Sequence, residues 1–319
     1  MRTALSNVLL IKFLAMPLDK RRESLENAYQ SLRDSSRDDW PGKSTSDAIK
    51  RLVLTSLKFL ASDCQLVDLK SMVSGKKYVG FRGNDGRTAV SRPANASLFI
   101  PDANKVNSKW ENWMNGKLPD SDLSAMAYTV ALAPCLAMEI FDRANKKGPA
   151  TYFEYLIGHL VSKEIGTPPS KQVQVPVREY PSHAVRLTMD FVFNLSDNHR
   201  LHLAIKMSSR ERVIQAWSHQ RILDSAFGVG RYTGLLVVFS ETKLDSRSLE
   251  VVEICVPNQW LAYQSYLGTL DRIYYFDIPG RYAELTANFP KLIKLRHFGE
   301  FFKRTERVEV FQKDEVQSD

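Results

Sequence analysis

The sequence predicts an α/β protein: a central mixed β-sheet of about five strands, flanked by helices on both faces, with a mainly helical N-terminal region. Three patterns lead to this class. Residues 153–161 repeat apolar side chains at the spacing of a helix. Residues 187–193 and 201–205 alternate apolar and polar side chains, which is typical of half-buried strands. Residues 234–240 form a continuous apolar run that suits a central strand.

The kind of secondary structure that the sequence predicts changes near residue 120. Before it, helical patterns alternate with polar stretches such as 34–46 and 80–93, where Gly, Asn, Asp and Arg cluster. After it, a dense apolar helix is followed by the strand-like segments. We therefore expect an N-terminal region over 1–120, a core domain over 121–311 and a charged tail over 312–319.

The overall charge favours a polyanionic partner. Forty-four Lys and Arg against 36 Asp and Glu give a net charge of +8 and a pI near 9.3. Such a balance attracts nucleic acid through the release of counterions. Many basic proteins bind no nucleic acid, so charge alone does not decide the partner.

Several features together predict a location in a reducing cytoplasm. The apolar stretch 8–18 is interrupted by Lys12 and lacks a cleavage site of small residues, so it does not resemble a signal peptide. Residues 125–141 carry Pro134 and Glu139 and are short for a membrane span, which favours a buried helix. The cysteines are odd in number without CxxC spacing, which predicts neither disulfides nor zinc: Cys64, Cys135 and Cys255.

The first candidate site residue lies on the helix that contains 153–161. Gly148 and Pro149 precede this helix, and we expect it to end near Gly166. Glu154 stands beside its apolar stripe. It is a candidate acid, or simply a residue on the flank of an amphipathic helix.

The next two candidates lie on a predicted hairpin. Asp190 is on the polar side of the first strand, and Lys206 follows the return strand 201–205. A hairpin centred on Asn198 places these two residues directly opposite each other, with their Cβ atoms about 5 Å apart. The pair is either part of an active site or a cross-strand ion pair without catalysis.

A helix is predicted to begin at Ser208. Ser208 offers an N-cap and Glu211, three residues later, completes a capping box. This places Arg210 and Arg212 in the first helical turn. The plain alternatives are that Glu211 only caps the helix and that the two arginines form a solvated face.

The C-terminal part predicts one further strand, over 249–256, and then helical and mixed segments from Pro257. The aromatic run Tyr274-Tyr275-Phe276 is most simply explained by core packing.

An acid, a lysine on the hairpin partner and a nearby glutamate supply the groups that phosphodiester hydrolysis needs. Carboxylates hold a hydrated divalent cation, which lowers the pKa of the attacking water and neutralises charge in the transition state. A lysine orients the nucleophile and stabilises developing negative charge.

These segments resemble a known family. The helix with Glu154, the hairpin with Asp190 and Lys206, the segment 206–212 (KMSSRER) and the late region 256–282 are similar to PD-(D/E)XK restriction endonucleases that read CCGG or CCNGG cores, the PspGI, EcoRII and NgoMIV-like group. The resemblance covers roughly residues 120–285. It implies a restriction endonuclease-like fold and a type II site-specific deoxyribonuclease that requires Mg²⁺, with Mn²⁺ as a substitute, and acts on double-stranded DNA as a homodimer.

The resemblance also implies roles. Asp190 would bind the metal, Lys206 would be the catalytic lysine, and Arg210, Glu211 and Arg212 would read C:G pairs. The chemistry agrees, because arginine can donate two hydrogen bonds to guanine and glutamate can accept one from cytosine in the major groove.

The chain departs from the family pattern at two positions. His219 stands thirteen residues after the lysine, where the group usually has its second metal-binding acid, and Ala204 stands where another acid is usual. The predicted metal ligands are therefore Asp190, Glu154 and His219, with Asp224 as a weaker candidate. A neutral imidazole suits Mn²⁺ better than Mg²⁺, and His219 is otherwise a structural or DNA-facing residue.

Three function hypotheses follow. The main one is a sequence-specific restriction endonuclease that cuts a short palindrome, with the basic groups at 20–22 and 76–77 adding backbone contacts to DNA. A sequence-specific DNA-binding protein with a weakened or lost nuclease site is the first alternative. A structure-selective repair or RNA-processing nuclease is the second.

Overall fold

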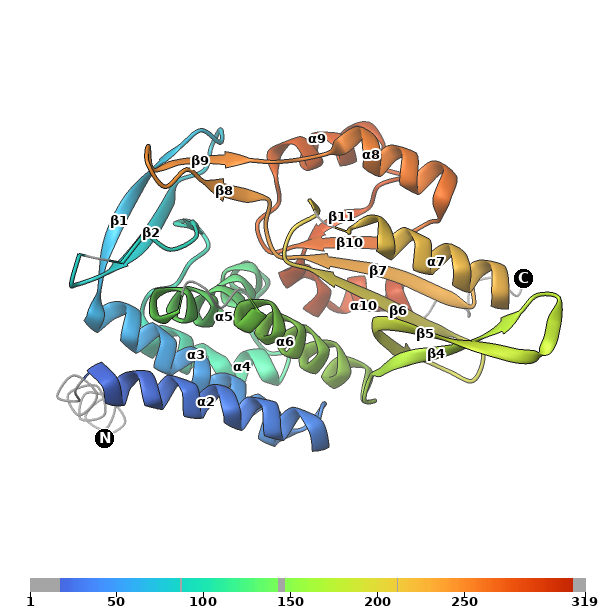
Figure 1. Ribbon diagram of the computed structural model, residues 1–319, viewed down its shortest axis with the longest axis horizontal. Helices are drawn as coiled ribbons and strands as arrows, with labels where there is room; N and C mark the ends of the chain where they lie inside the picture. The colour runs from blue at the N-terminus through green and yellow to red at the C-terminus, as the bar shows by residue number, and fades with distance from the viewer. Residues whose placement is uncertain (1–17, 87, 143–146, 211, 312–319) are drawn as a thin grey trace. The chain divides into compact units, whose positions relative to one another are not determined.

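The computed structural model describes residues 18–86, 88–142, 147–210 and 212–311. The chain folds into two compact units. The first contains the residues up to His159 and the segment Thr242–Val252, and the second contains Leu160–Glu241 and the residues from Glu253 onward. The predicted α/β class is confirmed (Figure 1). The expected boundary near residue 120, taken as the start of a nuclease core, stays a prediction.

The first unit combines helices with a small sheet. Its helices are α2 (Leu18–Asp38), α3 (Lys43–Asp63), α4 (Ala103–Met114), α5 (Asp120–Phe141) and the first part of α6 (Lys147–Ile165). Its sheet has the strand order β3-β2-β1-β9-β8, with the bounds β1 (Cys64–Ser71), β2 (Tyr78–Gly83), β3 (Ala94–Asn95), β8 (Thr242–Leu244) and β9 (Glu250–Glu253). The expected strand over 249–256 is therefore shorter than predicted. It pairs in parallel with β1, and not with the central sheet.

Helix α5 forms much of the core of the first unit. Among the described helices it alone has the length and apolar composition of a membrane span, but 72% of that stretch is buried inside the protein. The prediction of a buried helix is thus confirmed. Its acid is neutralised locally, because Arg92 Nε donates to Glu139 Oε1 at 2.8 Å.

The second unit is built on a mixed sheet with the order β11-β10-β7-β6-β5-β4. The strands are β4 (Ser170–Val177), β5 (Tyr180–Asn194), β6 (Arg200–Lys206), β7 (Tyr232–Val238), β10 (Arg272–Tyr275) and β11 (Leu295–His297). Strands β4, β5 and β6 are antiparallel, whereas β6, β7, β10 and β11 are parallel. Every residue of β7 is buried, as its continuous apolar run predicted.

Helices cover both faces of this sheet (Figure 1). They are α7 (Ile214–Phe227), α8 (Pro257–Ala262), the π-helix η1 (Tyr263–Leu267), α9 (Gly280–Asn288), the 3-10 helix η2 (Phe298–Phe302) and α10 (Arg304–Phe311). Alternate residues of β10 face opposite sides. Tyr275 packs in the cluster that contains Trp217 of α7, whereas Tyr274 packs against Phe298 and Phe301 of η2.

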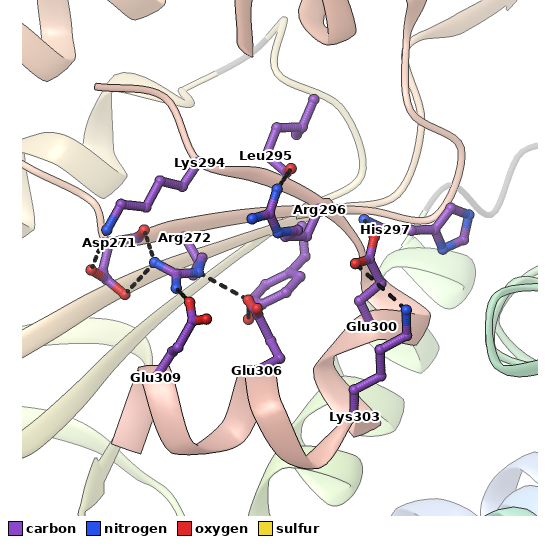
Figure 2. A network of polar contacts seen from close by, with 11 residues as sticks. Asp271, Arg272, Lys294, Leu295, Arg296, His297, Glu300, Lys303, Glu306 and Glu309 are labelled. Atoms are coloured by element: carbon purple, nitrogen blue, oxygen red, sulfur yellow. Dashed lines mark hydrogen bonds and ion pairs between the residues drawn. The ribbon is translucent and has the colours of Figure 1, made fainter. Parts of the chain in front are cut away.

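A buried arginine joins α10 to the sheet, as Figure 2 shows. Arg272 of β10 is 3% exposed, and its Nε lies 2.9 Å from Glu306 Oε1. Its two other nitrogens pair with Asp271 and Glu309. Tyr274 Oη also donates to Glu306, at 2.8 Å. Because each charge has a partner, the cost of burying the arginine is offset.

Candidate active site

The carboxylate of Asp190, within β5, and the ammonium of Lys206, the last residue of β6, meet side by side. Lys206 Nζ lies 2.9 Å from Asp190 Oδ2, and both side chains are partly buried. The backbone N–H of Ile205 donates to the same oxygen at 2.8 Å. The prediction that the acid and the lysine meet is confirmed.

The predicted register of the hairpin is wrong. Phe191 pairs with Leu203 and Asn194 with Arg200, so the hairpin is centred one residue earlier than Asn198. Continued by one residue, this register places Ala204 opposite Asp190. Lys206 is then a diagonal neighbour, and its long side chain spans the difference.

The pairing of β5 with β4 is irregular around Asp190. In the pairing with β4, Ser170 lies opposite Val192 and Gln172 lies opposite Thr188. Four steps along β5 thus match two steps along β4, with Asp190 at the middle of the bulged stretch. Such bulges redirect side chains and often occur beside active sites.

Two histidines adjoin this pair. His202 of β6 is fully buried, its Nδ1 lies 3.2 Å from Gln220 Oε1, and its ring lies 6.0 Å from that of His219 on α7. Burial lowers the pKa of His202 to about 4, and burial also lowers the pKa of His219. The charges of Asp190 and Lys206 influence both rings, and both imidazoles are mainly neutral near pH 7.

The Asp190–Lys206 pair contains one carboxylate. In the described ranges, no three His, Cys, Asp or Glu side chains form a group that could hold a metal ion by themselves. Ala204 packs in an apolar cluster with Val213 and Trp217, so the position where the family has an acid is apolar. A Mg²⁺ ion fits such a set when water and substrate phosphates complete its shell, because Mg²⁺ usually takes only one or two carboxylates.

The two other candidate acids, Glu154 and Asp224, lie on two different helices. Glu154 is half-buried on α6, within the first unit, whereas Asp190 and Lys206 belong to the second. Asp224 lies near the end of α7, where it accepts a hydrogen bond from Gln220 Nε2 at 2.9 Å. Burial raises the pKa of Asp224. Their roles as metal ligands stay predictions.

The predicted helix start at Ser208 is wrong. Helix α7 begins at Ile214 and has no side-chain cap, and Ser209 and Arg210 lie in a turn that precedes it. Arg210 and Arg212 are exposed, and Arg212 has a left-handed backbone with φ 53°. The predicted role of Glu211, in a capping box and in base reading, falls outside the residues that the structure describes.

Glu241 is a site residue that the sequence did not single out. It is 1% exposed, and its Oε1 accepts a hydrogen bond from the backbone N–H of Ser209 at 2.7 Å. The hydroxyl of Tyr275 donates to the same oxygen at 2.7 Å. Its position directly after the apolar run 234–240 was a usable cue, because functional groups gather at the carboxyl ends of parallel strands.

Comparison with known proteins supports the fold. No family model matches the chain, and neither does any of the curated proteins. The solved structure of restriction endonuclease PspGI with substrate DNA aligns with 92% of this chain and 93% of its own, at 14% identity and a TM-score of 0.39. The crystal structure of the type IIP restriction endonuclease Kpn2I aligns with 91% of this chain and 98% of its own, at 23% identity and a TM-score of 0.74. The chain therefore has the fold of a type IIP restriction endonuclease.

Proposed function

We propose that this chain is a sequence-specific type II restriction endonuclease. It hydrolyses phosphodiester bonds in double-stranded DNA at a short palindromic site with a CCGG or CCNGG-like core. The observation that supports this most is the ion pair between Asp190 of β5 and Lys206 at the end of β6, in a chain with a restriction endonuclease fold.

In this proposal Lys206 acts on the reacting phosphate. Its ammonium is held at the end of β6 by Asp190, so it orients the attacking water and stabilises negative charge as the bond to phosphorus forms. The partly buried setting strengthens this effect, because water screens the charge less than it does at an open surface.

Asp190 holds Mg²⁺, or Mn²⁺ in its place, with His219 and Glu154 as further candidate ligands. A bound cation would lower the pKa of a water and neutralise charge on the phosphate. Calorimetric titration of the protein with Mg²⁺ in the presence of DNA tests this assignment. Asp190→Ala should remove the metal dependence of DNA binding, and an unchanged titration would exclude Asp190 as a ligand.

Base recognition is assigned to Arg210, Glu211 and Arg212. Arg210 and Arg212 are exposed in the segment before α7, where a guanidinium can donate two hydrogen bonds to guanine. A palindromic site is matched by a two-fold protein, so the active form is a homodimer in the cytoplasm of a prokaryotic cell.

Sequencing of the ends produced from a complex double-stranded DNA tests activity and specificity together. The protein is incubated with the DNA in Mg²⁺, and the double variant Asp190→Ala/Lys206→Ala is the control. We expect defined ends at one palindromic sequence. Ends that depend on DNA structure or are spread over all sequences would instead indicate a repair-type nuclease.

Two observations favour a second candidate, a sequence-specific DNA-binding protein with a weakened nuclease site. Ala204 is packed in an apolar cluster, and the described residues contain no three-ligand metal group. A nicking assay on supercoiled plasmid, first with Mg²⁺ and then with Mn²⁺, separates the two candidates. Specific binding without nicking in either metal would support the binding protein.

A further inference from the structure

Glu241 lies in a buried network of hydrogen bonds that holds Ser209, the residue before Arg210. This network, the frame, consists of Glu241, Ser209, Tyr275 and Tyr282. Glu241 Oε1 accepts from the Ser209 N–H and from Tyr275 Oη, each at 2.7 Å. Its Oε2 has no hydrogen-bond partner among the described residues. A carboxylate that is removed from water to this degree costs free energy, so a compensating role is expected.

The side chain of Ser209 is held as well, by Tyr282. Ser209 Oγ lies 3.1 Å from Tyr282 Oη, which also accepts from the backbone N–H of Val256 at 3.0 Å. Tyr282 is fully buried and its ring stacks on Trp260 at a centroid distance of 4.1 Å. Ser209 is thus held through its backbone and its side chain by groups that cannot move independently.

Two arginines close to Ser209 in the sequence, Arg210 and Arg212, are exposed to solvent. Arg210 is exposed, yet its charge is close enough to oppose the rise in the pKa of Glu241 that burial causes. Arg212 has φ 53°, a conformation that costs an arginine free energy and persists only where the surrounding structure fixes it. The hydrogen bonds of the frame thus fix Ser209, the residue directly before the exposed Arg210.

We propose that Glu241 is a positioning residue for base recognition: by fixing Ser209, it sets the direction in which Arg210 leaves the protein. This inference rests on the proposed function. It assigns to Glu241 a share of the sequence discrimination, whereas the hydrolytic chemistry belongs to Asp190 and Lys206.

The test compares two variants of the full-length protein. Glu241→Ala removes the acceptor, whereas Glu241→Gln keeps an oxygen that can accept both hydrogen bonds. We measure kcat/KM on the preferred site and on sites with one G:C pair replaced. Glu241→Ala should lower the ratio of these values about tenfold or more, as expected when a hydrogen bond to a charged group is lost. Glu241→Gln should retain most of the discrimination, and so should the control Glu306→Gln, which alters another buried carboxylate.

A double-mutant cycle with Arg210→Ala tests whether Glu241 acts through that arginine. If it does, Glu241→Ala should cause no further loss of discrimination once Arg210 is removed. Additive losses would overturn the proposal. It would also be overturned if Glu241→Ala lowered the rates on all sites equally, or if Glu241→Gln lost as much discrimination as Glu241→Ala.

Limited proteolysis tests whether Glu241 holds Ser209 in place, and it does so without a measurement of nuclease activity. Trypsin cleaves after arginine, so a loosened segment should be cut after Arg210 about tenfold faster in Glu241→Ala than in the parent or in Glu306→Gln. Equal rates would overturn the proposal. If the parent cleaved no DNA, the proposed function would fail and this measurement would still decide the role of Glu241.

A milder variant covers the case in which Glu241→Ala does not fold. Ser209→Ala removes only the contact with Tyr282 Oη and leaves the Ser209 N–H on Glu241. In this variant trypsin should cut after Arg210 about threefold faster than in the parent, in line with the loss of one neutral hydrogen bond. An unchanged rate of cleavage after Arg210 in a folded Ser209→Ala protein would contradict the proposed role of the hydrogen bonds to Ser209.

Discussion

At the scale of single residues, the oxygen Oδ2 of Asp190 accepts hydrogen bonds from Lys206 Nζ and from the Ile205 backbone. The lysine is therefore fixed at the strand end before any substrate arrives. A positively charged group that is already in place stabilises a transition state without reorganisation at the moment of reaction.

Lys206→Ala should abolish cleavage and leave specific DNA binding largely intact, because the lysine acts on the transition state and not on the bases. The expected loss in kcat is at least about a hundredfold. Single-turnover cleavage and a gel-shift titration on the same site measure the two effects. Lys294→Ala, a more exposed lysine at 42% exposure, is the control. Cleavage at the parental rate would remove Lys206 from the active site.

Arg210→Ala and Arg212→Ala should each lose roughly 1–3 kcal/mol of discrimination at a G:C pair, if each arginine binds a guanine edge with two hydrogen bonds. Competition binding with single-substituted sites gives this value. A uniform loss of affinity across all sequences would instead assign the arginine to a phosphate contact, together with a smaller salt dependence.

His219→Glu should raise cleavage in Mg²⁺ relative to Mn²⁺, because Mg²⁺ prefers charged oxygen ligands to imidazole. The reason to expect an effect is that His219 lies within the electrostatic influence of Asp190 and Lys206. His219→Ala should impair cleavage in both metals. The rates of all three proteins are measured in each metal, and equal rates would place His219 outside the metal shell.

At the scale of elements, α10 depends on a buried charge network. Figure 2 shows Arg272 between Asp271, Glu306 and Glu309. Glu306 is largely buried, with 8% of its side chain exposed, whereas Glu309 is 60% exposed. The two glutamates contact the same arginine from very different surroundings, so they form a matched pair for experiment.

Glu306→Ala should lower the free energy of unfolding by about 3 kcal/mol, because it leaves the buried Arg272 and the hydroxyl of Tyr274 without their shared partner. Glu309→Ala should cost less than about 1 kcal/mol, since its carboxylate is exposed and screened by water. Urea denaturation of the two variants measures both values. Equal losses would mean that burial does not decide the strength of this network.

At the scale of the whole molecule, His202 makes stability depend on pH. Burial lowers its pKa from 6.5 to about 4, so the unfolded chain binds a proton between these values that the folded protein does not. Stability is therefore present above pH 6.5 and is lost as the pH falls toward 4, by up to about 3 kcal/mol.

The comparison of the parent with His202→Gln isolates this effect. The difference in unfolding free energy between the two proteins should change steadily from pH 6.5 to pH 4, in favour of the variant. The parent curve alone is less informative, because burial raises the pKa of Glu241 and Asp224, and these acids shift stability in the opposite sense. A constant difference across this range would contradict the assignment.

Local patterns in the sequence were sufficient for the elements that bury one continuous face. The alternation of apolar side chains located β5 and β6, the unbroken apolar run located β7, and the apolar stretch 125–141 located the buried part of α5. These patterns are local because the side-chain periods of strand and helix are fixed by the backbone. The presence of Asp190 and Lys206 on neighbouring strands followed from the same patterns.

Only the tertiary structure decided the register of the hairpin, the start of α7 and the role of Glu241. The hairpin pairs Phe191 with Leu203 and Asn194 with Arg200, and the predicted cap at Ser208 gave way to a turn whose Ser209 is held by Glu241. Likewise β9 joins β1, from the other end of the chain. Each outcome is set by the free energy of contacts between distant segments, which no local pattern in the sequence records.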